Sequence, residues 1–179
     1  MLHAIEVARQ IALLALAVGC VYTDLARGKL YNAATIGGLA LGLATAYLLD
    51  ARSPGLPNLK EAVLAATAGG GLLFVIYLLG GLGAGDVKFM AAVGALAPLR
   101  PGPAWGFVRL AMMYAALIGA AVAVGILIWQ GRLLQGLKDS ARTFVTFRAK
   151  KAEGAPATTV PYGLAIGVGT VWAWIETMV

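Results

Sequence analysis

Two aspartates, Asp24 and Asp86, stand just past the ends of long apolar segments, where a carboxylate is costly to keep. An ionisable side chain at membrane depth usually serves a function. If folding brings the two carboxyl groups together, they share one proton, because both cannot ionise cheaply side by side. Such a pair activates a water molecule, which is the chemistry of aspartic proteolysis. We therefore ask which elements position these two residues.

Each aspartate also has a simpler interpretation. Asp86 ends the segment Gly83-Ala84-Gly85-Asp86, which we expect to join two helices and in which glycines permit backbone conformations closed to other residues. Asp is also a favoured residue at the N-cap of a helix, so Asp86 could serve only to cap the helix that follows. Asp24 precedes Arg27 and Lys29, so it could form an ordinary ion pair in a surface loop.

The composition points to a membrane protein. Of 179 residues, 60% are hydrophobic and only 12% are charged, with a mean hydropathy of +0.84. Soluble domains carry about twice this share of charged residues. The net charge of +6 comes from Lys and Arg scattered between apolar segments, which argues against nucleic acid as a partner. We predict an all-α membrane protein, a polytopic bundle of about six transmembrane helices forming one domain over residues 1–179.

The apolar segments predict the spans. They cover about 5–22, 33–49, 62–82, 89–99, 105–129 and 160–178, and proline-containing turns separate several of them. The polar segment 130–159 is rich in Lys and Arg, and its middle, 133–147, has the pattern of a surface helix. Six spans place both aspartates and this basic loop on one side of the membrane. The excess of basic residues there predicts that this side is cytoplasmic.

The residues that most often bind metals are almost absent. Cys20 is the only cysteine and His3 the only histidine, so neither an internal disulfide nor a Cys or His metal cluster can form. We expect no metal and no organic cofactor.

Three sequence patches carry a resemblance to a known family. Asp24 is followed by Arg27 and Asn32, Gly83-Ala84-Gly85-Asp86 is followed by Val87-Lys88, and Pro161-Tyr162-Gly163 opens the last predicted span. In this order they resemble the type IV prepilin peptidases, over essentially all six spans. The chain is most similar to the short Tad or Flp pilus members, because it lacks the cysteine-containing cytoplasmic insertion of the larger bifunctional ones. It departs from the family at Leu30-Tyr31-Asn32, where a proline usually precedes the asparagine.

The resemblance implies an intramembrane aspartic endopeptidase of the bacterial inner membrane. It implies that the enzyme removes the leader of a prepilin or pseudopilin at the cytoplasmic face, in type IV pilus assembly or protein secretion, among membrane lipids and without methyltransferase activity. Asp24 and Asp86 match the catalytic pair of the family. The residues that would shape the site or bind substrate are Gly83, Gly85, Lys88, Arg27, Asn32, Pro161, Tyr162 and Gly163.

Two other classes of function remain open from the sequence. A small proton- or ion-coupled transporter component also uses acids within the membrane, but it favours acids near the middle of spans. A non-catalytic pilus or secretion assembly factor would use its glycine-rich helices to pack against partners and its basic loop to bind anionic lipid.

Overall fold

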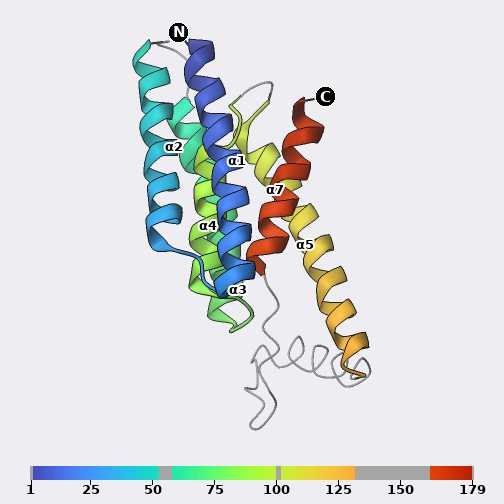
Figure 1. Cartoon of the computed structure of the whole chain (residues 1–179). Helices are drawn as coiled ribbons and strands as arrows, with labels where there is room; N and C mark the ends of the chain where they lie inside the picture. Colours follow the sequence, from blue (N-terminus) through green and yellow to red (C-terminus); the bar gives the residue numbers. More distant parts are fainter. Residues whose placement is uncertain (1, 53–57, 100–101, 132–161, 179) are drawn as a thin grey trace.

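The computed structural model describes residues 2–52, 58–99, 102–131 and 162–178, and these parts of the chain are entirely helical (Figure 1). The described helices are α1 (Leu2–Arg27), α2 (Asn32–Arg52), α3 (Asn58–Leu78), α4 (Ala84–Leu96), α5 (Ala104–Trp129) and α7 (Tyr162–Met178). Among the described residues, α1, α2, α3 and α5 are long and apolar enough to cross a membrane. The prediction of an all-α membrane protein is confirmed.

The helices alternate in direction, so their ends gather at two opposite ends of one bundle (Figure 1). The C-terminal end of α1 and the first turns of α4 and α7 meet at one end, whereas the two ends of the chain lie at the other (Figure 1). The C-terminal half of α5 leans away from the rest of the bundle (Figure 1). Residues that are far apart in the sequence therefore share the end where α1 stops.

Helix α4 forms the centre of the bundle. Its 13 residues extend about 20 Å, which is too short to cross a hydrocarbon core of about 30 Å alone. Most of its side chains, including Phe89 and Met90, are fully buried against the surrounding helices. Gly94 lets α4 approach α3 closely, because a Cβ atom there would lie 2.5 Å from the backbone oxygen of Ala65. The helix that carries Asp86 is thus held mainly by neighbouring helices, although Ala84 and Lys88 near its start are exposed.

Several helix boundaries differ from the predicted spans. Helix α1 extends to Arg27, so Asp24 lies in its last turn and the prediction of a surface loop at Asp24 is wrong. The helix ends at Gly28, whose φ of 60° suits glycine and whose N–H donates to the backbone oxygen of Asp24. Helix α4 begins at Ala84 rather than near Phe89. The predicted surface helix 133–147 lies outside the described residues.

Helix α3 begins four residues earlier than its predicted span because Asp50 caps it. The carboxylate of Asp50, near the end of α2, accepts hydrogen bonds from the backbone N–H groups of Asn58 at 2.8 Å and Leu59 at 2.9 Å. These N–H groups belong to the first turn of α3 and have no partner within the helix. The side chain thereby fixes where α3 starts, which apolar content alone did not predict.

A buried guanidinium joins three helices at the end of the bundle away from Asp24. Arg9 of α1 is 1% exposed and donates to the backbone oxygens of Gly42 in α2, and of Ala95 and Ala97 at the end of α4. Its neighbour Glu6 lies 3.8 Å away and accepts the N–H of Leu99. Arg9 therefore fastens the far end of α4 rather than facing lipid headgroups.

Candidate active site

Both aspartates line one pocket at the end of the bundle where α1 stops. The pocket has a volume of about 310 Å³ and receives Asp24 from α1, Asp86 from α4 and Tyr162 from α7. Two loops complete it, with Gly28 and Leu30 from one and the segment 80–83 from the other. The fold therefore places two carboxyl groups that are 62 residues apart in the sequence around one small space.

Asp86 lies in the first turn of α4, and its side chain is nearly buried. The residue is 8% exposed, and its Oδ2 accepts a hydrogen bond from the N–H of Gly83 at 3.1 Å. Gly83 occupies the N-cap position, so the prediction that Asp86 itself is the N-cap is wrong. The carboxylate still helps to start the helix, and its other oxygen, Oδ1, is left for another partner.

Burial raises the pKa of Asp86. The pKa of the Asp86 carboxyl group rises from 3.8 to about 6. Asp86 belongs to α4, which is not one of the four described helices long and apolar enough to cross a membrane. Desolvation is the largest cause, and the negative charge of Asp24 adds to it, while the hydrogen bond from Gly83 acts in the opposite direction. Asp86 consequently holds a proton at a pH where an exposed aspartate has already lost it.

Asp24 is oriented by the first turn of α7. Its Oδ2 accepts a hydrogen bond from the backbone N–H of Leu164 at 3.1 Å, across 140 residues of sequence. Gly163 lies directly against the carboxyl group, because a Cβ atom there would be 2.7 Å from Oδ2. The first backbone N–H groups of a helix have no partner within the helix, so that of Leu164 is available to bind the carboxyl group. The two aspartates therefore have different surroundings, one largely buried and one held by a helix end.

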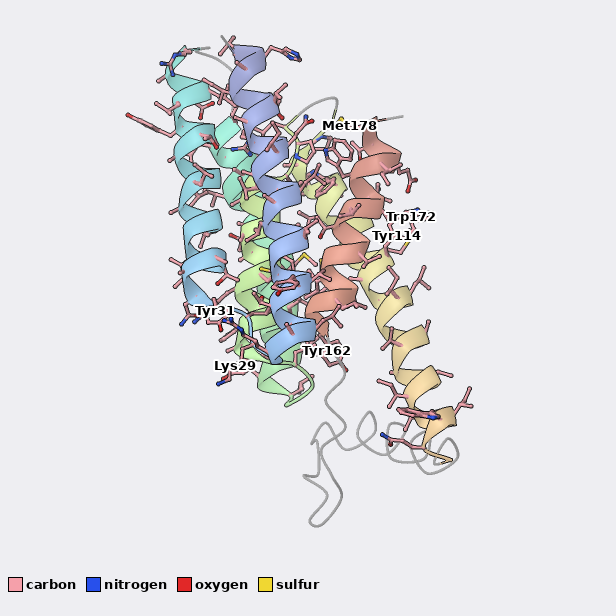
Figure 2. The ribbon with its side chains drawn as sticks, viewed as in Figure 1. Lys29, Tyr31, Tyr114, Tyr162, Trp172 and Met178 are labelled. Carbon is pink, nitrogen blue, oxygen red and sulfur yellow. The ribbon has the colours of Figure 1, made fainter. Side chains whose placement is uncertain are left out.

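Tyr162 contributes an aromatic side chain to the lining of the pocket. Its half-buried side chain lies at the same end of the bundle as Lys29 and Tyr31 (Figure 2). The Tyr162 hydroxyl is a hydrogen-bond donor as well as an acceptor, so it can donate a hydrogen bond into the pocket that it lines. Pro161, which precedes it, lies outside the described residues.

The two glycines before Asp86 allow close contacts with neighbouring side chains and do not serve to permit unusual backbone angles. Gly83 has a φ of −85°, and positive φ values among the described glycines occur at other positions. Our expectation of a special backbone conformation is therefore wrong for this pair. A Cβ atom at Gly83 would lie 3.2 Å from Oδ2 of Asp86, and one at Gly85 would lie 3.1 Å from Cβ of Leu30. Both contacts allow the loops around the pocket to close tightly.

The remaining predicted site residues lie beside the pocket rather than in it. Lys88 donates to Oδ1 of Asn32 at 3.0 Å and joins α4 to the start of α2. Arg27 donates to the hydroxyl of Tyr31 at 2.6 Å and lies over its ring. The pocket that holds the aspartates is lined by none of these side chains: Arg27, Tyr31, Asn32 and Lys88. The structure assigns them to the α1–α2 connection and its contact with α4.

Several contributors to the pocket were not predicted from the sequence, among them Gly28 and the segment 80–82, which line it. Leu30 packs against Gly85, and the N–H of Leu164 orients Asp24. A backbone N–H leaves no mark on residue type, so nothing in the sequence identified Leu164. Leu30 could have been noticed because it belongs to Leu30-Tyr31-Asn32, where the sequence departs from the family pattern, shortly after the end of α1.

A known protein family matches about two thirds of the chain. Residues 11–128 match the model of the type IV leader peptidase family. The matched region includes both aspartates and ends before α7. Searches of curated proteins and of solved structures found no match.

Proposed function

Because the chain belongs to the type IV leader peptidase family, which consists of aspartic-type prepilin peptidases, we propose that Asp24 and Asp86 form its catalytic pair. The observation that carries this proposal is that both carboxyl groups line one pocket of about 310 Å³ in unlike surroundings. A transporter component is disfavoured, because both acids lie at one end of the bundle rather than along a path through it.

We assign different roles to the two carboxyl groups. Asp86, with its raised pKa, holds the proton, and Asp24, held by the N–H of Leu164, acts as the base. Asp24 removes a proton from water, whose oxygen bonds to the scissile carbonyl carbon, while Asp86 donates its proton to the carbonyl oxygen. As the C–N bond breaks, the leaving amine takes the proton from Asp24, and Asp86 recovers its proton from the collapsing intermediate. The hydroxyl of Tyr162 donates a further hydrogen bond to the carbonyl oxygen of the scissile bond.

The substrate and the orientation are part of the proposal. The pocket end carries basic side chains, including Lys29, Lys88 and Arg27, so the positive-inside rule favours the cytoplasmic face of the bacterial inner membrane for this end. The basic segment 130–159 then belongs to the same face, within one domain over residues 1–179. The substrate class is a prepilin of the Flp-like type, cleaved without a metal or organic cofactor.

The test is cleavage of a co-expressed prepilin by the wild-type chain and by two conservative variants. Asp24→Asn and Asp86→Asn keep the size and hydrogen-bond acceptor of each side chain but remove the titrating carboxyl group. We expect no shortening of the substrate by either variant at normal membrane levels. Asp50→Asn, at the opposite end of the bundle, is the matched control and retains cleavage. Wild-type cleavage by either site variant would refute the catalytic pair and favour a non-catalytic assembly role.

A further inference from the structure

A second, larger cavity lies next to the aspartate pocket. It forms an apolar groove of about 800 Å³ between α3 and α5, with the first turns of α7 and Met90 of α4 at its base. We call it the α3/α5 groove and define it by Leu72 and Ile76 of α3, Ala116, Ala120 and Ala123 of α5, and Ile166 of α7. Ala120 and Ala123, which line it, lie in the C-terminal half of α5, and this half leans away from the bundle (Figure 1).

The groove runs nearly the full depth of a membrane. Along α5 its lining extends from Trp105 to Ala123, a rise of about 27 Å at 1.5 Å per residue. The hydrocarbon core of a bilayer is about 30 Å thick. The groove therefore matches the length of a transmembrane helix rather than that of a short peptide.

The two walls differ in a way that suits a packed helix. The α5 wall presents Ala116, Ala120 and Ala123, and small residues let helix backbones approach closely within a membrane. Met112 and Met113 line the same wall, and methionine adapts to partners of varied shape. The α3 wall presents larger apolar side chains. Such a surface accepts one face of an apolar helix without demanding a fixed sequence.

The groove adjoins the aspartate pocket. Gly81, Leu82 and Tyr162 line both, so one end of a molecule in the groove lies beside the two carboxyl groups. A phospholipid chain placed there would bring its anionic phosphate against Asp24 and Asp86, which like charges oppose. A polypeptide carries its neutral backbone to the same point.

We propose that the substrate carries an apolar helix next to the bond that is cleaved and that the α3/α5 groove binds this helix, so that the substrate enters sideways from the bilayer. This inference rests on the proposed function and adds to it the part of the substrate that is recognised. The helix lies against the small-residue wall of α5, and the chain leaves it at Tyr162 to place the scissile bond between the aspartates.

The first experiment blocks the groove without touching the pocket. Ala120→Trp fills it from an exposed position on α5, and Leu117→Trp is the matched control on the same helix, because Leu117 is 61% exposed and does not line the groove. With a membrane-embedded prepilin, we expect Ala120→Trp to raise KM at least tenfold with kcat within about twofold. Leu117→Trp should leave both unchanged. Equal cleavage by wild type and Ala120→Trp, or equal losses in both variants, overturns the proposal.

A crosslinking experiment tests the groove independently of cleavage. Ala120→Cys and Leu117→Cys are each paired with a prepilin that carries single cysteines along its apolar helix, and mild oxidation is applied. The wild-type chain controls for Cys20, which is buried. Disulfides at position 120 with a helical repeat along the prepilin support the groove, even in a chain that fails to cleave. Their absence at 120, or equal yield at 117, refutes it whether or not cleavage occurs.

Discussion

Gly163→Ala tests how the first turn of α7 positions Asp24. The added Cβ atom would lie 2.7 Å from Oδ2 and 2.9 Å from Cγ of Asp24, whereas ordinary contacts begin near 3.4 Å. The carboxyl group must therefore move by about 0.7 Å or rotate, and it gives up its 3.1 Å hydrogen bond from Leu164. A hydrogen bond to a charged group contributes about 1.5–3 kcal/mol. A displacement of about 1 Å in a catalytic site costs about a hundredfold in rate.

We accordingly expect Gly163→Ala to lower kcat for prepilin cleavage by about ten- to a hundredfold with little change in KM. Overpacking at this contact should lower the free energy of unfolding by about 1–3 kcal/mol. The assay is cleavage of purified prepilin in detergent, with thermal unfolding measured on the same samples. Gly37→Ala is the matched control, because a Cβ atom at Gly37 meets nothing within 4 Å, and it should keep the wild-type rate. A wild-type kcat in a folded Gly163→Ala chain would refute the positioning role of α7.

Three further predictions concern charge and packing. The pKa of Asp86 is raised to about 6, so protonated Asp86 becomes more abundant as the pH falls from 8 towards 6, and the single-turnover rate should rise over that range; a rate that falls instead contradicts its role as the acid. Arg9→Met removes the donor to three backbone oxygens and should lower the free energy of unfolding by about 3 kcal/mol. Arg52→Met, at an exposed position, should change it little. Equal thermal unfolding of the two variants would disprove the role of Arg9 in fastening the end of α4. Asp50→Ala removes the cap of α3 and should cost about 0.5–2 kcal/mol, and urea unfolding that matches wild type would count against capping.

Helix boundaries were predicted well where the apolar content of the segment determines them. They were predicted poorly where a residue distant in the sequence determines them. The apolar segments placed α2 and α5 within a few residues, because their ends coincide with polar or proline-containing turns. The start of α3 depended on Asp50, which lies in another helix, and no local pattern encodes that contact. The central position of α4 depended on its short length and on close approach at Gly94.

The candidate site divides in a similar way. The position of the two aspartates at one end of the bundle could be predicted from their residue type and their spans, whereas Tyr162 was expected there only from the resemblance to the family. Arg27 and Lys88 have equally suggestive types, yet each is engaged by a neighbour beside the pocket. Only the folded backbone distinguishes the residues that line the pocket from Arg27 and Lys88, because the position of a residue around its helix decides whether its side chain faces the pocket.

The hydrogen bond between Asp24 and Leu164 has a consequence for the timing of synthesis. A ribosome makes the chain from its N-terminus, so α1 and α4 enter the membrane with both aspartates long before the start of α7 has been translated. Until then Asp24 lacks the N–H that orients it, and the pocket lacks its lining at Tyr162. We expect a nascent chain ending after α5 to be inserted but inactive. On this expectation α7 completes a site that is otherwise already assembled, and chains without α7 leave neighbouring membrane proteins uncut.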